Sequence, residues 1–207
     1  MTAKTQTEPS KTPDTQRVRM PLLHHVSIKT RDVQAIIDWY ELVIGSRVMF
    51  RFDGGAFISN DEANHRMAIF TAPSLVDDDE RLTRTGLHHV GYEYPSLDDL
   101  LATYVRLKAG GVLPSACLDH GQATSFYYFD PDGNGVELQV DNYGSWEKSS
   151  DFILNDPRFL ADPIGTPVNP DLMVAARDQG MSPDEIHERA YRGEMPPATT
   201  HDLRLPD

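Results

Sequence analysis

The sequence predicts an α+β fold in which two βαβββ modules form one curved, barrel-like mixed sheet, followed by a helical and irregular C-terminal extension. The main observation is an internal repeat, because L-H-H-V-S-I at residues 23–28 recurs as L-H-H-V-G-Y at residues 87–92. Each copy is followed by an amphipathic stretch that ends near a glycine, and then by three short extended runs. The chain therefore contains two copies of one supersecondary unit.

In the first module, apolar residues at helical spacing predict a helix over residues 33–42, before Gly45. Strands are predicted over residues 47–52, 55–59 and 66–71. In the second module, the same patterns predict a helix over residues 97–108 and strands over residues 111–118, 124–130 and 135–140. The turn D-P-D-G-N-G at residues 130–135 predicts a hairpin between the last two of these strands.

The chain divides into three parts. Residues 1–20 lack the apolar core of a secretory signal and are expected to form a flexible N-terminal tail. Residues 21–143 form the paired domain, with modules at 22–72 and 86–141 and an acidic linker between them. Residues 144–207 form the extension, with short helices at 170–179 and 183–192, the second with Ser182 as its N-cap.

Composition excludes several classes of function. The net charge of −13 and the lack of a cluster of Lys and Arg argue against a nucleic-acid partner. No apolar run approaches the roughly 18 residues of a membrane span, so no membrane partner and a cytoplasmic location are expected. Cys117 is the single cysteine, which rules out an internal disulfide and favours a buried apolar role for this residue.

Strand alternation singles out three residues with metal-binding side chains. If Val26 and Ile28 face the helix, then His25 faces the opposite side, and the same argument applies to His89 in the repeat. In the strand at 135–140 the alternate apolar residues leave Glu137 on that side as well. Two imidazoles and one carboxylate, with coordination positions left over, are the ligand set of a catalytic non-heme Fe(II) or related site. His25, His89 and Glu137 are therefore the predicted metal ligands.

The paired modules, with H-H-V opening each and G-N-G-V-E-L closing the second, resemble the vicinal oxygen chelate superfamily over residues 22–140. That superfamily includes glyoxalases, bleomycin-resistance proteins, fosfomycin-resistance enzymes and type I extradiol dioxygenases. The resemblance is strongest to the extradiol dioxygenases, because Tyr127 and His65 stand where those enzymes carry an active-site tyrosine and histidine. A further family histidine is matched less closely by His120, whose spacing to Tyr127 differs. Glyoxalase I has a fourth side-chain ligand, for which M-A-I-F-T at residues 67–71 offers no equivalent.

The resemblance implies an oxidoreductase of aromatic catabolism that cleaves a catechol-type ring with O2. Fe(II) is the expected cofactor and Mn(II) the second choice. Tyr127 would hydrogen-bond a substrate oxygen, and His65 would stabilise reduced oxygen and act in acid-base catalysis. Most type I enzymes have four modules, whereas this chain has two. It would therefore belong with the one-domain members, and a homo-oligomer is expected.

Two other functions remain open at this point. One is a non-oxidative lyase, isomerase or thiol transferase of the same superfamily, and the other is a small-molecule-binding resistance protein. The first histidine of each pair, His24 and His88, is expected to support or pack against the ligand. His187 and His201 are expected at the surface.

Overall fold

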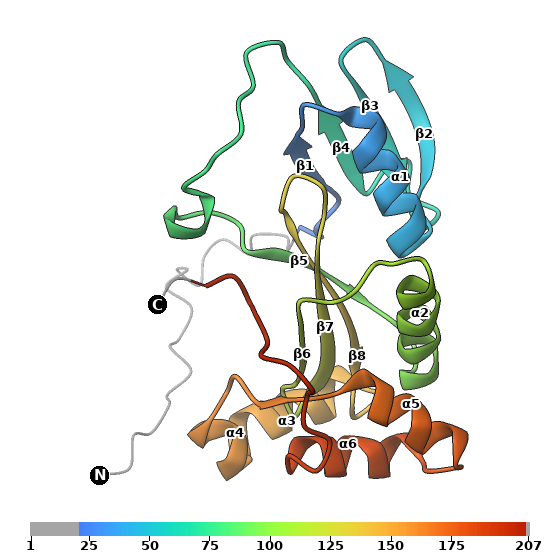
Figure 1. The fold of residues 1–207 in the computed structure, drawn as a ribbon, viewed down its shortest axis with the longest axis vertical. Coiled ribbons are helices and arrows are strands. Elements are labelled where there is room, and N and C mark those ends of the chain that lie inside the picture. Colours follow the sequence, from blue (N-terminus) through green and yellow to red (C-terminus); the bar gives the residue numbers. More distant parts are fainter. Residues whose placement is uncertain (1–20, 206–207) are drawn as a thin grey trace, which may run out of the picture.

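The computed structural model describes residues 21–205, so the predicted tail at residues 1–20 lies outside the described residues. The first module contains β1 (Val26–Lys29), α1 (Val33–Ile44), β2 (Arg47–Phe52), β3 (Gly55–Ser59) and β4 (Met67–Phe70). A 3-10 turn, η1 (Arg81–Thr83), lies in the linker. The second module contains β5 (His89–Glu93), α2 (Leu97–Ala109), β6 (Ala116–Asp119), β7 (Ala123–Phe129) and β8 (Gly135–Asp141). The α+β class and the repeated βαβββ order are confirmed (Figure 1).

The two modules share one topology. The first sheet has the order β1-β4-β3-β2, and the second has the order β5-β8-β7-β6 with an added strand, β9 (Thr166–Pro167). In each module the first strand pairs in parallel with the last, while the other pairs are antiparallel. Within the described residues the strands form two hydrogen-bonded sheets rather than the expected single one.

Both module helices begin and end at residues suited to these positions. The side chain of Asp32 accepts a hydrogen bond from the Ala35 amide at the start of α1, and Gly45 ends this helix with φ 67°. The Ser96 side chain accepts from the Asp99 amide at the start of α2, where Asp98 and Asp99 suit the helix dipole. The two helices are therefore predictable from local chemistry.

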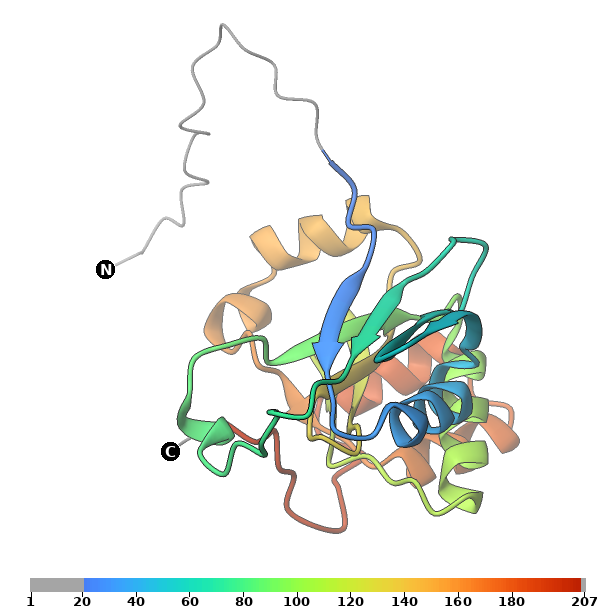
Figure 2. The same ribbon diagram turned by 90° about the horizontal axis from the view of Figure 1, so that it is seen from above.

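One hydrophobic core lies between the helices and the sheets. Val136, Leu138 and Val140 of β8 belong to it, together with Ile36 of α1 and Leu100 of α2. The helices lie side by side along one flank of the molecule (Figures 1 and 2). A hydrogen bond of 2.6 Å from Arg106 Nη1 to the Leu42 carbonyl joins them. The face of each sheet that points away from its helix does not belong to this core.

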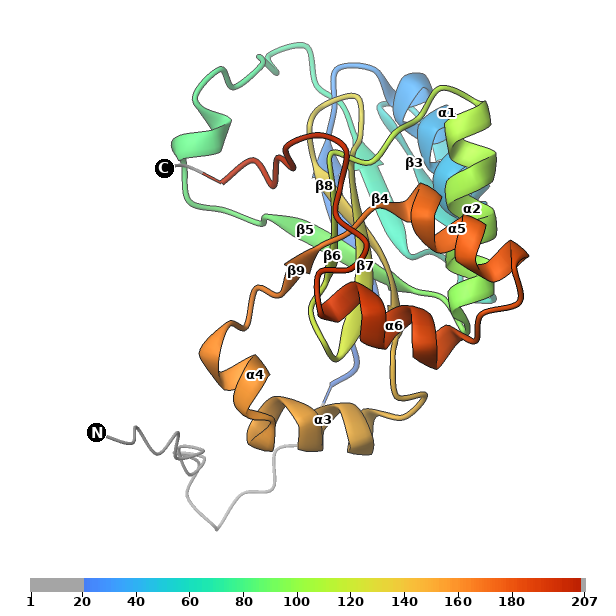
Figure 3. The same ribbon diagram turned by 60° about the horizontal axis from the view of Figure 1, so that its bottom comes forward.

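The C-terminal extension covers the lower end and one edge of the second sheet (Figure 3). It contains α3 (Trp146–Asn155), α4 (Pro157–Ala161), β9, α5 (Pro170–Asp178) and α6 (Pro183–Tyr191). The side chain of Ser182 caps α6 as predicted, whereas α3 and α4 were not predicted. β9 pairs with β6 and places Pro167 opposite Leu118. No helix in residues 21–205 is long and apolar enough to span a bilayer.

Three side chains test the expectations for buried and surface positions. Cys117 is buried, as predicted. The prediction of a surface position is wrong for His187, which is 6% exposed, because its Nδ1 lies 2.8 Å from Oδ2 of the buried Asp119. His201 is half-buried, and its Nδ1 accepts a hydrogen bond from the Cys117 amide. Both histidines anchor the extension to β6.

Candidate active site

Strand register brings three of the predicted residues together on the second sheet. Glu137 lies opposite Gly91 in the parallel β5·β8 pair and opposite Tyr127 in the antiparallel β7·β8 pair. Directly opposed residues share a face, and His89 lies two residues from Gly91 on that same face. His89 Nε2 is 3.1 Å from Glu137 Oε2, and the Tyr127 hydroxyl donates to Glu137 Oε1 at 2.7 Å.

His120 extends this group by one more contact. It directly follows β6, and its Nε2 lies 2.8 Å from the Tyr127 hydroxyl. Its Nδ1 lies 2.6 Å from the Ile164 carbonyl. A carbonyl can only accept, so His120 carries a hydrogen on Nδ1 and directs Nε2 at Tyr127. The extension thus orients His120, which is something the sequence did not reveal.

The charges in this group follow from burial and hydrogen bonding. Burial raises the pKa of Glu137, but hydrogen bonds from His89, Tyr127 and Ser125 outweigh it and lower that pKa to about 2. Burial, and then the negative charge of Glu137, raise the pKa of Tyr127 far above its usual value. At neutral pH the site therefore contains an ionised carboxylate beside a neutral phenol.

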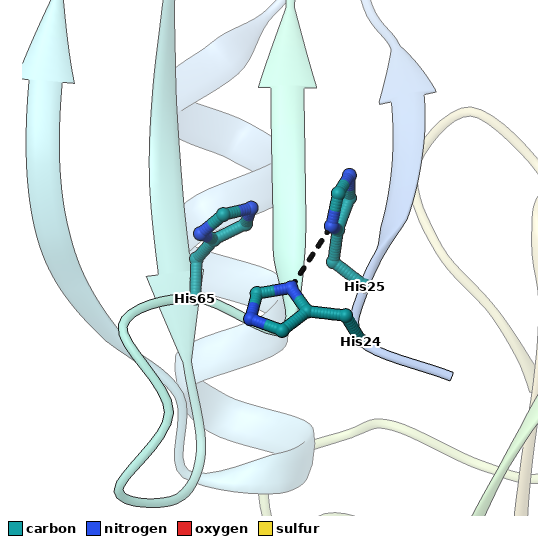
Figure 4. A group of neighbouring side chains, drawn as sticks. All are labelled: His24, His25 and His65. Carbon is teal, nitrogen blue, oxygen red and sulfur yellow. Dashed lines mark hydrogen bonds between the residues drawn. The ribbon is translucent and has the colours of Figure 1, made fainter. Parts of the chain in front are cut away.

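A second group of side chains lies on the first sheet (Figure 4). His24, His25 and His65 each offer one ring nitrogen, and these atoms lie within 4.8 Å of one another. His24 Nδ1 is 3.0 Å from His25 Nδ1, and the His65 ring stacks on Phe57 with 4.7 Å between centroids. Burial, and then the charges of His25 and His24, lower the pKa of His65, which is therefore neutral at pH 7.

The six predicted site residues thus fall into two groups. His89, Glu137, Tyr127 and His120 form one, while His25 and His65 join His24 in the other. A cavity of about 270 Å³ is lined by residues of both modules, including His25 and Gly91. A Cβ at Gly91 would lie 3.2 Å from Glu137 Oε2, although Glu137 itself does not line this cavity. The role of His25 as third ligand to the same ion stays a prediction.

The donor atoms on the second sheet fit a divalent metal ion. Two ligands held about 2.1 Å from one ion at right angles are about 3.0 Å apart, and His89 Nε2 and Glu137 Oε2 are separated by 3.1 Å. Neutral imidazole and carboxylate are ligands of non-heme Fe(II) and of Mn(II). His89 and Glu137 are the residues of the second sheet that could hold the ion, whereas His25 lies with His24 and His65 on the first sheet.

His88 was expected only to support or pack against the ligand, and its contacts give it a defined place. Its Nδ1 lies 2.7 Å from His89 Nδ1, and its Nε2 lies 2.9 Å from the Leu203 carbonyl. His24 makes the same contact with His25 in the first module. The repeated H-H pair in the sequence indicated the contact between neighbouring histidines. No sequence pattern indicated the contact between His88 and the Leu203 carbonyl.

Comparison with known proteins places the chain in a family. The chain is 36% identical over 186 residues to biphenyl-2,3-diol 1,2-dioxygenase 2 of Rhodococcus globerulus, covering 90% of this chain and 95% of that protein. It is 34% identical over 171 residues to biphenyl-2,3-diol 1,2-dioxygenase 3 of the same organism, covering 83% and 90%.

A solved glyoxylase/bleomycin resistance protein/dioxygenase domain from Frankia sp. EAN1pec has the same fold, with a TM-score of 0.51 and 20% identity. The alignment covers 59% of this chain and 93% of that one. The sequence profile of one superfamily matches residues 22–138, which include both modules up to β8. The chain therefore belongs to the Glyoxalase/Bleomycin resistance protein/Dioxygenase superfamily.

Proposed function

We propose that this protein is an extradiol ring-cleaving dioxygenase, which inserts O2 into a catechol-type aromatic diol at a mononuclear metal ion. The observation that carries the proposal is the continuous chain of contacts from His120 through Tyr127 and Glu137 to His89 on one sheet face. Two relatives at 34–36% identity, each named as a biphenyl-2,3-diol 1,2-dioxygenase, also support the proposal.

The proposed metal ligands are His25, His89 and Glu137, and the proposed ion is Fe(II), with Mn(II) as the second choice. When bound, the ion would lower the pKa of a diol hydroxyl and offer open positions to the diol and O2. Glu137 suits this role because it is 8% exposed and ionised at neutral pH. Its charge favours a cation over any anionic occupant.

Tyr127 and His120 would act on the diol as a pair. The neutral phenol of Tyr127 can donate a hydrogen bond to a substrate oxygen, because its raised pKa keeps the proton in place. His120 Nε2 lies 2.8 Å from the same hydroxyl, whose single hydrogen goes to Glu137 Oε1 in this structure. Tyr127 could donate that hydrogen to His120 Nε2 or to the substrate instead once Glu137 holds the ion.

His65 would serve on the first sheet, beside His25. Its lowered pKa keeps the imidazole neutral at pH 7, so it can take up a proton during the reaction and return it later. Its ring is held by stacking on Phe57 and lies 4.6 Å from the ring of His25. His65 is therefore the proposed acid-base residue.

The free face of the first sheet suits an aromatic substrate. Register places Phe50 opposite Phe57, and both Phe52 and Phe70 opposite Gly55, so the four rings share the face that continues to His65. Phe50 is 58% and Phe70 is 42% exposed. Rings on this face can pack against a flat apolar substrate by edge and face contacts.

The test is anaerobic reconstitution with Fe(II), followed by a panel of catechols and then air. The expected result is oxygen uptake with a yellow ring-cleavage product, absent in Glu137→Ala, which should also lose the metal. Asp141→Ala, a carboxylate at the other end of β8, is the matched control and should remain active. Metal retention without oxygen uptake on any catechol would overturn the dioxygenase proposal.

The expected homo-oligomer stays a prediction, which light scattering would check.

A further inference from the structure

The last described residues cross the site face of the second sheet, beyond the region that the superfamily profile matches. After α6, the chain runs past β6 toward the segment before β5 (Figures 1 and 3). The Asp202 amide donates to the Ser115 carbonyl at 3.0 Å, and the Cys117 amide donates to His201 Nδ1 at 3.0 Å. We call residues 201–204 the tail strap.

The tail strap has a defined conformation at its end. Arg204 has φ 52°, a left-handed value that a residue with a side chain adopts only when its surroundings hold it there. Its amide donates to Asp202 Oδ1 at 2.7 Å, and its guanidinium lies 4.1 Å from the centre of the Phe129 ring. These contacts fix the residue before it, Leu203.

Leu203 contacts the site in two ways. Its side chain packs against the small cluster of Ala116, Leu118 and Tyr127, which contains the phenol that donates to Glu137. Its carbonyl lies 2.9 Å from His88 Nε2. One residue of the tail strap therefore touches both this cluster and the histidine pair.

The Leu203 carbonyl sets the positions of hydrogens along the histidine pair. Because a carbonyl only accepts, His88 carries a hydrogen on Nε2, and its Nδ1 in the neutral ring is an acceptor. His89 must then donate from Nδ1 across the 2.7 Å contact, so its Nε2, whose hydrogen Glu137 accepts at 3.1 Å when no ion is bound, is the nitrogen left for the ion. Loss of that hydrogen gives the form of His89 that can bind a metal ion.

We propose that the tail strap is a positioning element of the metal site, in which the Leu203 carbonyl acts through His88 to hold His89 with Nε2 free for the ion. The proposal rests on the proposed site at His89 and Glu137. It gives the C-terminal extension a role in metal binding besides covering the sheet. His88 is a positioning residue, because it touches the ligand and not the ion.

The test is titration of the metal-free, full-length protein with Co(II), followed by visible absorption, which reads metal affinity without turnover. His88→Leu removes both contacts and should weaken Co(II) binding about 10- to 100-fold. His88→Asn retains an acceptor toward His89 and should recover most of this loss. Leu203→Gly removes the side-chain packing and loosens the carbonyl, and should weaken binding in the same direction by a smaller factor.

Double variants separate the relay from a general loss of structure. Adding Leu203→Gly to His88→Leu should weaken Co(II) binding no further, because the shared path is already broken. Adding it to His24→Leu, which changes the equivalent pair in the first module, should multiply the two effects. Circular dichroism checks that each variant is folded.

Each outcome decides one question. If Glu137→Gln leaves Co(II) affinity unchanged, the proposed metal site itself is wrong. If Glu137→Gln abolishes binding while His88→Leu, His88→Asn and Leu203→Gly all bind as the parent does, the site stands and the relay is overturned. Full additivity of His88→Leu and Leu203→Gly would also overturn it, because the tail strap would then act only as a cover.

Discussion

Replacing Tyr127 by phenylalanine removes one hydroxyl from the centre of the site. That hydroxyl donates to the buried, ionised Glu137 at 2.7 Å. A hydrogen bond to a charged group contributes about 1.5–3 kcal/mol to stability. For a chain of this size, each kcal/mol shifts the melting temperature by about 2–4 °C. Tyr127→Phe should therefore lower the melting temperature of the metal-free protein by about 3–12 °C.

Activity should fall as well, by about 10²- to 10⁴-fold in kcat, if Tyr127 positions or protonates the diol. The matched control is Tyr128→Phe, because Tyr128 is 1% exposed, points into the core and has a hydroxyl without a hydrogen-bond partner among the described residues. This control should melt at the parent temperature or above and keep its activity. Calorimetry and oxygen uptake provide the two measurements. Equal behaviour of the two variants in both would refute the role assigned to Tyr127.

Three further predictions concern the site border, the pH limit and the scaffold. Gly91→Ala should weaken Co(II) binding with little change in melting temperature, because the added Cβ would lie 3.2 Å from Glu137 Oε2; unchanged affinity would show that the carboxylate can move away. Burial raises the pKa of Tyr92 from 10.0 in the unfolded chain to about 12 in the folded protein. The contribution of the protonated phenol to stability is therefore complete below pH 10 and is lost between pH 10 and 12. Urea midpoints should therefore fall across that interval, and less steeply in Tyr92→Phe; parallel curves would contradict the assignment. Ser96→Ala removes the cap of α2 and should cost about 1 kcal/mol in urea unfolding without changing kcat, since α2 packs on the face opposite the site. A fall in kcat beyond the loss of folded protein would argue against this separation.

The sequence predicted those features that depend on local patterns. Alternation along β8 placed Glu137 opposite the core residues Val136 and Leu138, and the structure confirms that face. The repeated strand order follows from short-range patterns in the same way, and so does the Ser182 cap of α6. The pairing of Tyr127 with Glu137 follows once the hairpin at residues 130–135 sets the register.

Contacts between distant segments were not predictable. The helices α3 and α4 have 10 and 5 residues, which is too short for a helical period to stand out, although Ser145 caps α3 as a local signal would indicate. His187 was expected at the surface because it lies in the C-terminal extension, but its buried partner Asp119 lies 68 positions earlier. Leu203 and His88 are separated by 115 positions, and no pattern in either segment points to the other.

The pairing of β2 with β3 is irregular at one point, and this has a consequence for association between molecules. β2 is the outer strand of the first sheet, whereas the corresponding strand of the second sheet, β6, is covered by β9. The register shift between Val48 and Phe50 interrupts the regular spacing of amide and carbonyl groups along β2. A strand from another molecule could therefore form regular hydrogen bonds with only a short part of the outer edge of β2. This limits edge-to-edge aggregation through the first sheet.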